Sequence, residues 1–522
     1  MKNLILDGNN LNIQDIEALV KDSSFRVQVS NAGLIKVKQS KKFLDEKGQG
    51  KDIIYGVNTG FGPMASHIID KDLMATLQEN LVRSHAVGMG QYIDSKYVLA
   101  AMIARLNALA KGYSGVSVSL IHKLEEFINL RIIPLVPEHG AVGTSGDLVQ
   151  LAHIALAVIG EGEVLYKDQI RKTKDVLKEL DIQPHQLELK EGLALINATA
   201  MMSGIASLLL RKSDQLLALS VRLGALAFEL MHGFTDSLSE RAHNFRPHVG
   251  QISIAKVLRT LLIDSKMTRD RKSLIRRIDS KEKIIEIPED VQQVYSLRCI
   301  PQILGPVFDS MAKTKKEVEI EINAVTDNPI VDWEGDQFLH GGNFHGDYIA
   351  ASMDQLKMGL VKLTILSERR TNFFLDHKTN RFFPPFMNLD RPGLTLGLQG
   401  LQFVATSTTA QSQTYAFPHS VHSISTNGSN QDVVSMGTDV ALIAAKVIEN
   451  AFIVLAIELI TLAQGVDFLN SQARLSSSSR QLYDNLRKIF PAIKKDRELI
   501  AQLAEVVKFV EEGPGIPVDW NK

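Results

Sequence analysis

Residues 137–164 read PEHGAVGTSGDLVQLAHIALAVIGEGEV, so a loop of small residues stands directly before an apolar run. The run predicts a buried helix over 148–159, with Ser145 or Asp147 as its N-cap. An N-cap alone does not explain why three glycines fall within residues 140–146. The cap interpretation therefore leaves these glycines unexplained.

Long helical patterns dominate the rest of the chain. Apolar residues recur three and four positions apart in residues 96–112, 204–233, 306–323, 347–374 and 439–466. Helices of this length that are apolar on more than one face pack best as a bundle. Strand patterns are few and short, namely residues 53–57 and a hairpin over 163–172. A mainly α fold is expected.

The patterns divide the chain into three consecutive parts. Residues 1–200 are expected to form an N-terminal mixed domain that carries the glycine-rich loop. Residues 201–474 are expected to form a central bundle of long helices, and residues 475–522 smaller C-terminal helices.

Composition narrows the class of protein. The 522 residues carry a net charge of −1, which gives no electrostatic reason to bind nucleic acid or an anionic membrane. The single cysteine, Cys299, excludes intramolecular disulfides and suits a reducing compartment. The apolar tract 439–466 contains Lys446, Glu449 and Glu458, which favours burial in protein rather than lipid. Because the N-terminus also lacks a signal-peptide core, we expect a cytoplasmic globular protein.

The common catalytic motifs are missing from the sequence. It contains no phosphate-binding Gly-x-x-x-x-Gly-Lys loop, no dinucleotide-binding Gly-x-Gly-x-x-Gly after a strand, and no His-Glu-x-x-His. His340 and His345 flank flexible glycines, but a metal site needs a third ligand and none can be named. Ser145 does not stand in a Gly-x-Ser-x-Gly elbow, so a serine hydrolase is disfavoured. We expect no metal.

Seven motifs resemble one family when they are taken in order. They are YGVNTGFGPM (55–64), GTSGDL (143–148), EGLALINAT (191–199), YSLRCIPQILGP (295–306), TDNP (326–329), GGNFHG (341–346) and NQDVVSMG (430–437). This set is similar to the aromatic amino acid ammonia-lyases, which include histidine, phenylalanine and tyrosine ammonia-lyases and related aminomutases. The resemblance covers about residues 50–470. It implies an ammonia-lyase/fumarase-like fold and a homotetramer whose active sites are each built from several subunits.

The resemblance gives the glycine-rich loop a second purpose. In that family an Ala-Ser-Gly or Thr-Ser-Gly tripeptide cyclises to 4-methylidene-imidazol-5-one (MIO), here from Thr144, Ser145 and Gly146. The Gly146 nitrogen must attack the Thr144 carbonyl, an approach that a Cβ would hinder. Ser145 then loses its hydroxyl as water. The resulting electrophile binds the substrate's amine and makes it leave more readily.

Tyr55 resembles the family's base, which removes the substrate's β-proton. Since a phenol is normally protonated at pH 7, the site must stabilise its ionised form with hydrogen bonds or positive dipoles. Gly56, Gly60 and Gly62 indicate a mobile lid that orders over the substrate, with Gly62 among the substrate-binding residues. The alternative interpretation is that Tyr55 is a strand residue packed in the core.

Arg298 matches the family's anchor for the substrate carboxylate, because a guanidinium binds a carboxylate through two parallel hydrogen bonds. Tyr295 would share a helical face with Arg298, and its counterpart positions substrate and cofactor. The other matched positions, expected to contact cofactor or substrate, are Asn197, Gln292, Asn328, Phe344 and Asn427. By themselves these would be loop amides and a core ring.

The residues expected near the substrate ring resemble those of two different kinds of enzyme in the family. Ser84 and His85 resemble the Ser-His pair of histidine ammonia-lyases. Gln431, however, stands where those enzymes have a glutamate, and Val433 replaces a histidine. GDLVQLAH departs from the commoner GDLAPLAH in the direction of a bacterial tyrosine ammonia-lyase subgroup that keeps Ser-His.

Tyrosine is the substrate that these residues favour. The loss of a carboxylate partner for imidazole costs a few kcal/mol, whereas His85 can form a hydrogen bond with a phenolic hydroxyl. We therefore expect a tyrosine ammonia-lyase that yields p-coumarate and ammonia. The alternatives are a histidine ammonia-lyase, an aromatic 2,3-aminomutase, and a helical scaffold protein with a dead site.

Overall fold

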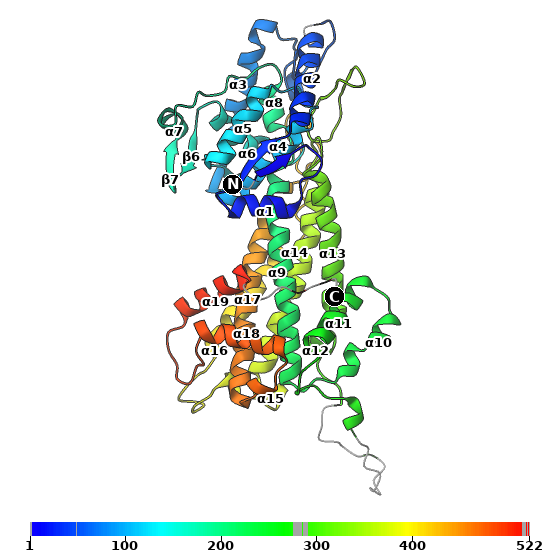
Figure 1. Ribbon diagram of the computed structural model, residues 1–522, viewed down its shortest axis with the longest axis vertical. Coiled ribbons are helices and arrows are strands. Elements are labelled where there is room, and N and C mark those ends of the chain that lie inside the picture. The colour runs from blue at the N-terminus through cyan, green and yellow to red at the C-terminus, as the bar shows by residue number, and fades with distance from the viewer. Residues whose placement is uncertain are drawn as a thin grey trace. The chain divides into compact units, whose positions relative to one another are not determined.

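The computed structural model describes residues 3–48, 50–274, 284, 291–513, 518 and 520. Long helices dominate this part of the chain, so the predicted mainly α fold is confirmed (Figure 1). The helices expected from periodicity are present as α4 (Ser95–Ala110), α6 (Leu148–Val158), α9 (Ala200–Leu230), α13 (Ile300–Glu321), α14 (Asp347–Leu375) and α17 (Gly437–Leu469).

The described chain contains further α-helices. Before α9 these are α1 (Ile13–Lys21), α2 (Asn31–Lys47), α3 (Met74–His85), α5 (Val118–Leu130), α7 (Thr173–Glu179) and α8 (Glu191–Ile196). After α9 they are α10 (Glu240–Asn244), α11 (Val249–Leu261), α12 (Tyr295–Arg298), α15 (His377–Asn380), α16 (Gln399–Tyr415), α18 (Ser477–Ile489) and α19 (Ile500–Glu512). The last two are the small C-terminal helices that the sequence predicts.

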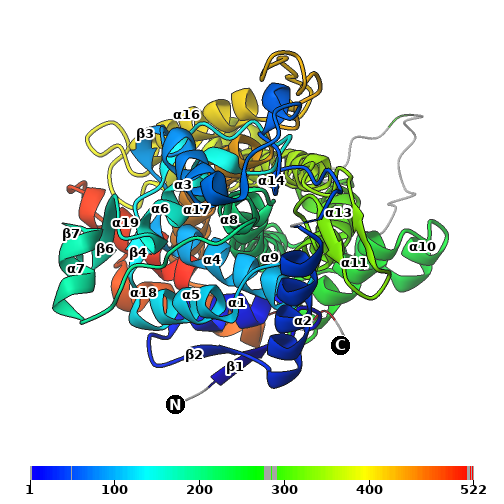
Figure 2. The ribbon, with the colours of Figure 1, turned by 90° about the horizontal axis from the view of Figure 1, so that it is seen from above.

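The strands are short and form separate small sheets. β1 (Asn3–Leu6) pairs in parallel with β2 (Arg26–Val29), which packs against α5 (Figure 2). The antiparallel pairs are β3 (Met89–Tyr92) with β5 (Pro137–His139), β4 (Ile133–Pro134) with β6 (Glu163–Tyr166), β6 with β7 (Gln169–Lys172), and β8 (Ile330–Asp332) with β9 (Gln337–Leu339). The β6–β7 pair confirms the hairpin expected over 163–172.

The strand predicted over residues 53–57 is wrong, because this segment is a loop with a turn. The Asn58 side chain accepts the Ile54 N–H at 2.8 Å and donates to the Asp52 carbonyl at 2.7 Å. The Gly56 N–H donates to Thr59 Oγ1 at 3.0 Å. These side chains bind the backbone groups that a strand would use for pairing.

The chain forms two compact units. Unit 1 comprises Met1–Arg211, Lys313–Gln355 and Pro418–Ala445, and unit 2 comprises Lys212–Ala312, Leu356–Phe417 and Lys446–Lys522. The long helices α9, α13, α14 and α17 each contribute residues to both units, so neither unit is a consecutive segment. The division into three consecutive parts remains a prediction.

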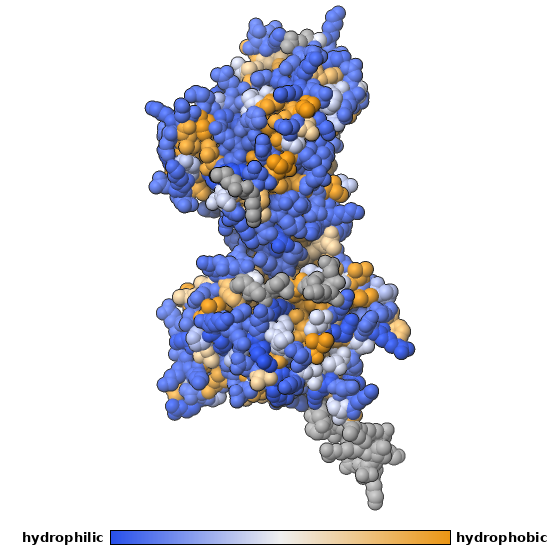
Figure 3. All heavy atoms as spheres, in the orientation of Figure 1, coloured by the Kyte–Doolittle hydropathy of each residue, from blue (hydrophilic) through white to orange (hydrophobic). Residues whose placement is uncertain are grey.

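Two stretches in the described part of the chain are long and apolar enough to cross a membrane, judged by length and composition alone. Their most apolar windows, within Glu191–Leu230 and Gly437–Leu469, are 100% and 72% buried inside the protein. The face in Figure 3 is mostly hydrophilic, with apolar residues in scattered groups. Core packing therefore accounts for the composition of both stretches.

Candidate active site

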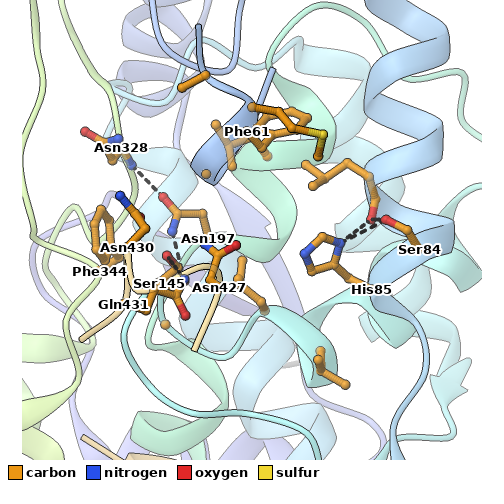
Figure 4. Close-up of a pocket in the computed structure, with 18 of the residues that line it drawn as sticks. Phe61, Ser84, His85, Ser145, Asn197, Asn328, Phe344, Asn427, Asn430 and Gln431 are labelled. Carbon is orange, nitrogen blue, oxygen red and sulfur yellow. Dashed lines mark hydrogen bonds between the residues drawn. The ribbon is translucent and has the colours of Figure 1, made fainter. Parts of the chain in front are cut away.

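A cavity of about 850 Å³ in unit 1 brings together most of the residues singled out in the sequence (Figure 4). Its walls come from α3, the loop before α3, the glycine-rich loop before α6, and the loop before α17. The predicted residues that line it are Tyr55, Gly62, Ser84, His85, Ser145, Gly146, Asn197, Asn328, Phe344, Asn427 and Gln431.

Gln292, Tyr295 and Arg298 belong to unit 2 and are not among the lining residues. Tyr295 and Arg298 lie in the short helix α12, where the guanidinium carbon is 4.6 Å from the centre of the tyrosine ring. The shared face expected from their spacing is thus confirmed. Arg298 Nε donates to the Gln293 carbonyl at 2.9 Å.

Asp147 stands at the N-cap position of α6, but its side chain forms no cap hydrogen bond there, which corrects the simple capping interpretation. Its carboxylate accepts the N–H groups of Met201 and Met202, in the first turn of α9, at 2.8 and 3.1 Å, and the Thr438 hydroxyl of α17. Burial raises the pKa of Asp147 to about 7, although these hydrogen bonds lower it. Asp147 therefore fixes the loop to two helices.

The glycine-rich loop is packed so closely that side chains are excluded. Gly143 and Gly146 have φ angles of +72° and +73°, in the left-handed region that favours glycine. A Cβ on Gly146 would lie 2.0 Å from the Ala198 carbonyl oxygen, and one on Gly143 would lie 2.1 Å from Ser435 Oγ. Only glycine fits at either position.

Ser145 is held in the cavity by amide side chains. Asn197 Nδ2 donates to the Ser145 carbonyl at 2.8 Å, and Asn197 Oδ1 accepts the Asn328 N–H at 2.9 Å. Gln431 Nε2 donates to Ser145 Oγ at 2.9 Å. The Thr144 hydroxyl, which is outside the cavity lining, donates to Gln431 Oε1 at 2.8 Å. Both the carbonyl and the hydroxyl of Ser145 are therefore fixed.

Tyr55 is fixed at both ends of the residue. Its phenolic oxygen accepts the Gly62 N–H at 3.0 Å, and its backbone N–H donates to His340 Nε2 at 3.2 Å. The Phe61 ring packs edge-on at 6.3 Å between ring centres. The Gly62 N–H and the Phe61 ring therefore fix where the phenolic oxygen lies in the cavity.

His85 points into the cavity from α3, and its Nε2 faces away from Ser84 (Figure 4). Nδ1 lies 2.9 Å from the Leu81 carbonyl and 3.1 Å from Ser84 Oγ. Because a carbonyl oxygen only accepts, Nδ1 carries the proton, and Nε2 of the neutral ring is an acceptor. The α3 wall therefore presents a hydrogen-bond acceptor to the cavity.

Several lining residues were not singled out in the sequence. Leu77, Asn80 and Leu81 lie one or two turns before Ser84 and His85 on α3, so helical spacing alone could have found them. Thr426 and Asn430 lie beside Asn427 and Gln431 in a turn closed by the Thr426 N–H and the Gln431 carbonyl. The other lining residues not singled out are Phe61, Met64, Ala65, Gly140, Val142, Leu148, Val149 and Leu193.

The two histidines of HGGNFHG contact different partners. His340 Nε2 accepts the Tyr55 N–H, and His345 Nε2 lies 3.2 Å from the Val433 carbonyl. Within the ranges that the structure describes, no group of three His, Cys, Asp or Glu side chains is arranged to hold a metal ion.

Comparison with known proteins gives a consistent result. The family model described as aromatic amino acid lyase matches residues 11–488. A tyrosine 2,3-aminomutase from Chondromyces crocatus is 37% identical over 97% of this chain and 96% of its own length. A histidine ammonia-lyase from Staphylococcus aureus is 38% identical over 98% of both chains. The solved tyrosine aminomutase from Streptomyces globisporus superposes with a TM-score of 0.95, at 34% identity, over 98% of both chains.

Proposed function

Because the chain belongs to the aromatic amino acid lyase family, we propose that it removes ammonia from an aromatic L-amino acid, with L-tyrosine as substrate and p-coumarate as product. The observation that carries this proposal is the cavity in which Ser145, Tyr55 and His85 meet. These residues supply, in turn, the precursor of an electrophile, a base and a hydrogen-bond acceptor for a phenol.

The loop fits a methylidene-imidazolone formed from Thr144, Ser145 and Gly146. Its glycines leave no room for a Cβ beside Ala198 and Ser435. Asn197, bound to the Ser145 carbonyl, and Gln431, bound to the Thr144 hydroxyl, would hold the group. When formed, the group supplies an electrophile that turns the substrate's amine into a better leaving group.

Tyr55 is proposed to take the β-proton of the substrate. The electron pair of the Cβ–H bond becomes the second bond between Cα and Cβ, the Cα–N bond breaks, and its pair leaves on nitrogen as ammonia. The Gly62 N–H holds in place the Tyr55 oxygen that accepts the proton. A phenolic hydroxyl on the substrate can donate to His85 Nε2, which supports tyrosine over phenylalanine.

We further propose a cytoplasmic homotetramer in which a partner chain supplies Arg298 to bind the substrate carboxylate. The single cysteine in 522 residues supports the compartment. The exposure of Tyr295, which is 68% accessible beside Arg298, supports a contact with another chain at α12.

A tyrosine 2,3-aminomutase is the second candidate, because a relative of that name is 37% identical over nearly the whole chain and a solved tyrosine aminomutase is 34% identical. Incubation of the purified protein with tyrosine, histidine and phenylalanine decides between the candidates. Conjugated acrylate from tyrosine supports the proposal, and β-tyrosine supports the aminomutase. Urocanate formed faster than p-coumarate overturns the tyrosine assignment. An intact mass without the loss of two waters overturns the cofactor.

A further inference from the structure

His340 lies immediately after β9 and contacts the residue that we propose as the base. Its Nε2 is 3.2 Å from the Tyr55 backbone nitrogen, which donates its N–H. A ring nitrogen that accepts carries no proton, so Nδ1 of the neutral ring holds it. No other function described above uses this histidine.

The next residue, Gly341, connects the same segment to Ser145. The Gly341 N–H donates to Asn328 Oδ1 at 2.8 Å. From Asn328 the bonds run through Asn197 to the Ser145 carbonyl. The β8–β9 hairpin explains why Gly341 lies beside Asn328. Its pairing of Ile330 with Leu339 brings together the residues just outside the two strands. The dipeptide His340-Gly341 thus joins Tyr55 to Ser145.

Hydrogen bonds, rather than packing, set the position of this segment. A Cβ added to Gly341 or Gly342 would have no neighbour within 4 Å. On the other side of the contact, Tyr55 lies in a loop without strand pairing, and Gly56 is held by Gln78 and Thr59. The N–H of Tyr55 itself donates its hydrogen bond to His340.

We propose that His340 is a positioning residue for Tyr55, which it holds at a fixed distance from Ser145 by accepting the Tyr55 N–H. This inference rests on the proposed function, in which Tyr55 takes the β-proton. Proton transfer depends steeply on the position of the base, and a misplacement of about 1 Å can lower the rate about a hundredfold. Because this bond joins His340 to Tyr55 alone, we expect its loss to leave binding of the substrate and formation of the cofactor unchanged.

The test compares His340→Leu, which removes the acceptor, with His340→Gln, whose Oε1 replaces Nε2. We expect His340→Leu to lower kcat on tyrosine about tenfold to a hundredfold with KM changed less than about twofold. The isotope effect with β-deuterated tyrosine should rise, because proton removal becomes slower. His340→Gln should retain most of the wild-type kcat. His340→Asn, whose amide is one carbon shorter, should behave like His340→Leu.

His122→Gln and His122→Leu are matched controls, since His122 is an exposed histidine that contacts Glu125 on α5. Both should keep the wild-type kcat. The intact mass of every variant should show the same loss of two waters. A wild type inactive on all three aromatic amino acids refutes the proposed function. An active wild type with an unaltered kcat and isotope effect in His340→Leu and His340→Asn, or an equal loss of kcat in His340→Gln, overturns the role of His340.

Discussion

Ser145 carries two contacts with different consequences, since its carbonyl is bound by Asn197 and its hydroxyl by Gln431. Ser145→Ala removes the oxygen that must leave as water and keeps the carbonyl contact. We expect a folded protein, because one lost hydrogen bond costs about 1 kcal/mol. Its intact mass should lack the loss of two waters, and its turnover should fall by several orders of magnitude. Near-normal turnover would contradict the cofactor.

His85 gives the substrate preference a direct test. His85→Phe replaces the Nε2 acceptor by an apolar ring wall, so a tyrosine hydroxyl loses its partner and phenylalanine gains contact area. The ratio of kcat/KM for tyrosine to that for phenylalanine should fall about tenfold to a hundredfold, equivalent to about 1–3 kcal/mol. The measurement is kcat/KM for tyrosine, phenylalanine and histidine in the wild type and in His85→Phe. An unchanged ratio, or a wild type that prefers histidine, contradicts the tyrosine proposal.

The resemblance to the family's motifs identified nearly half of the residues that line the cavity. Ser145, Asn197 and Gln431 come from three motifs far apart in the sequence, and the structure brings them into hydrogen-bond contact. The role of Asp147 could not be predicted in this way. In sequence, Asp147 stands at the N-cap of α6. Its carboxylate binds the N–H groups of α9 instead, because tertiary packing brings the start of α9 to it.

At the scale of elements, Asp147 links the start of α9 to the start of α17. Burial raises its folded-state pKa from 3.8 to about 7, so between these values the folded protein keeps a proton that the unfolded chain has lost. The free energy of unfolding should therefore decrease as pH rises from about 4 to about 7, by on the order of a few kcal/mol.

Asp147→Asn removes this titration, and its side-chain oxygen can still accept the helix N–H groups. The variant should become more stable relative to the wild type as pH rises from 4.5 to 8, which melting temperatures at both values measure. Asp376→Asn is the control, because Asp376 caps α15 at the surface, and hydrogen bonds from Thr379 and Lys378 lower its pKa. The control should show no such trend over this range. If the melting temperature of the wild type instead rises relative to that of Asp147→Asn as the pH increases, the proposed dependence of stability on the pKa of Asp147 is wrong.

The helices could be predicted from the sequence because their signal is local. Apolar residues three and four apart fix α9, α14 and α17 within a few residues of their observed ends. Only part of the strand structure could be predicted: the β6–β7 hairpin has a local pattern, whereas the pairing of β1 with β2 across α1 has none. The strand prediction for residues 53–57 was wrong for another reason. Their strand-like composition is overridden by side chains that bind the local backbone.

At the scale of the whole molecule, Arg298 is the predicted substrate anchor that the cavity lining does not include. Sequence motifs identify such a residue, but they do not say which copy of the chain supplies it. The proposed homotetramer answers this, because symmetric assembly can bring α12 of one chain to the cavity of another. Sedimentation should therefore show a tetramer, and an active monomer would contradict the proposal.

Complementation between two inactive variants tests shared sites directly. Ser145→Ala lacks the electrophile and Arg298→Ala lacks the anchor, so each tetramer alone should have very low activity. When both chains are expressed together with different tags and mixed tetramers are isolated, random assembly leaves about a quarter of the sites with an intact Ser145 and an intact Arg298 from different chains.

The mixed tetramers should then recover about a quarter of wild-type activity on tyrosine. Ser145→Ala paired with Asn197→Ala is the control. These two residues are bonded within one chain, so no mixed site regains both, and activity should stay at the level of the parents. No recovery with Arg298→Ala would show that the partner chain does not supply the anchor. Recovery in the control would contradict the use of recovered activity as evidence for it.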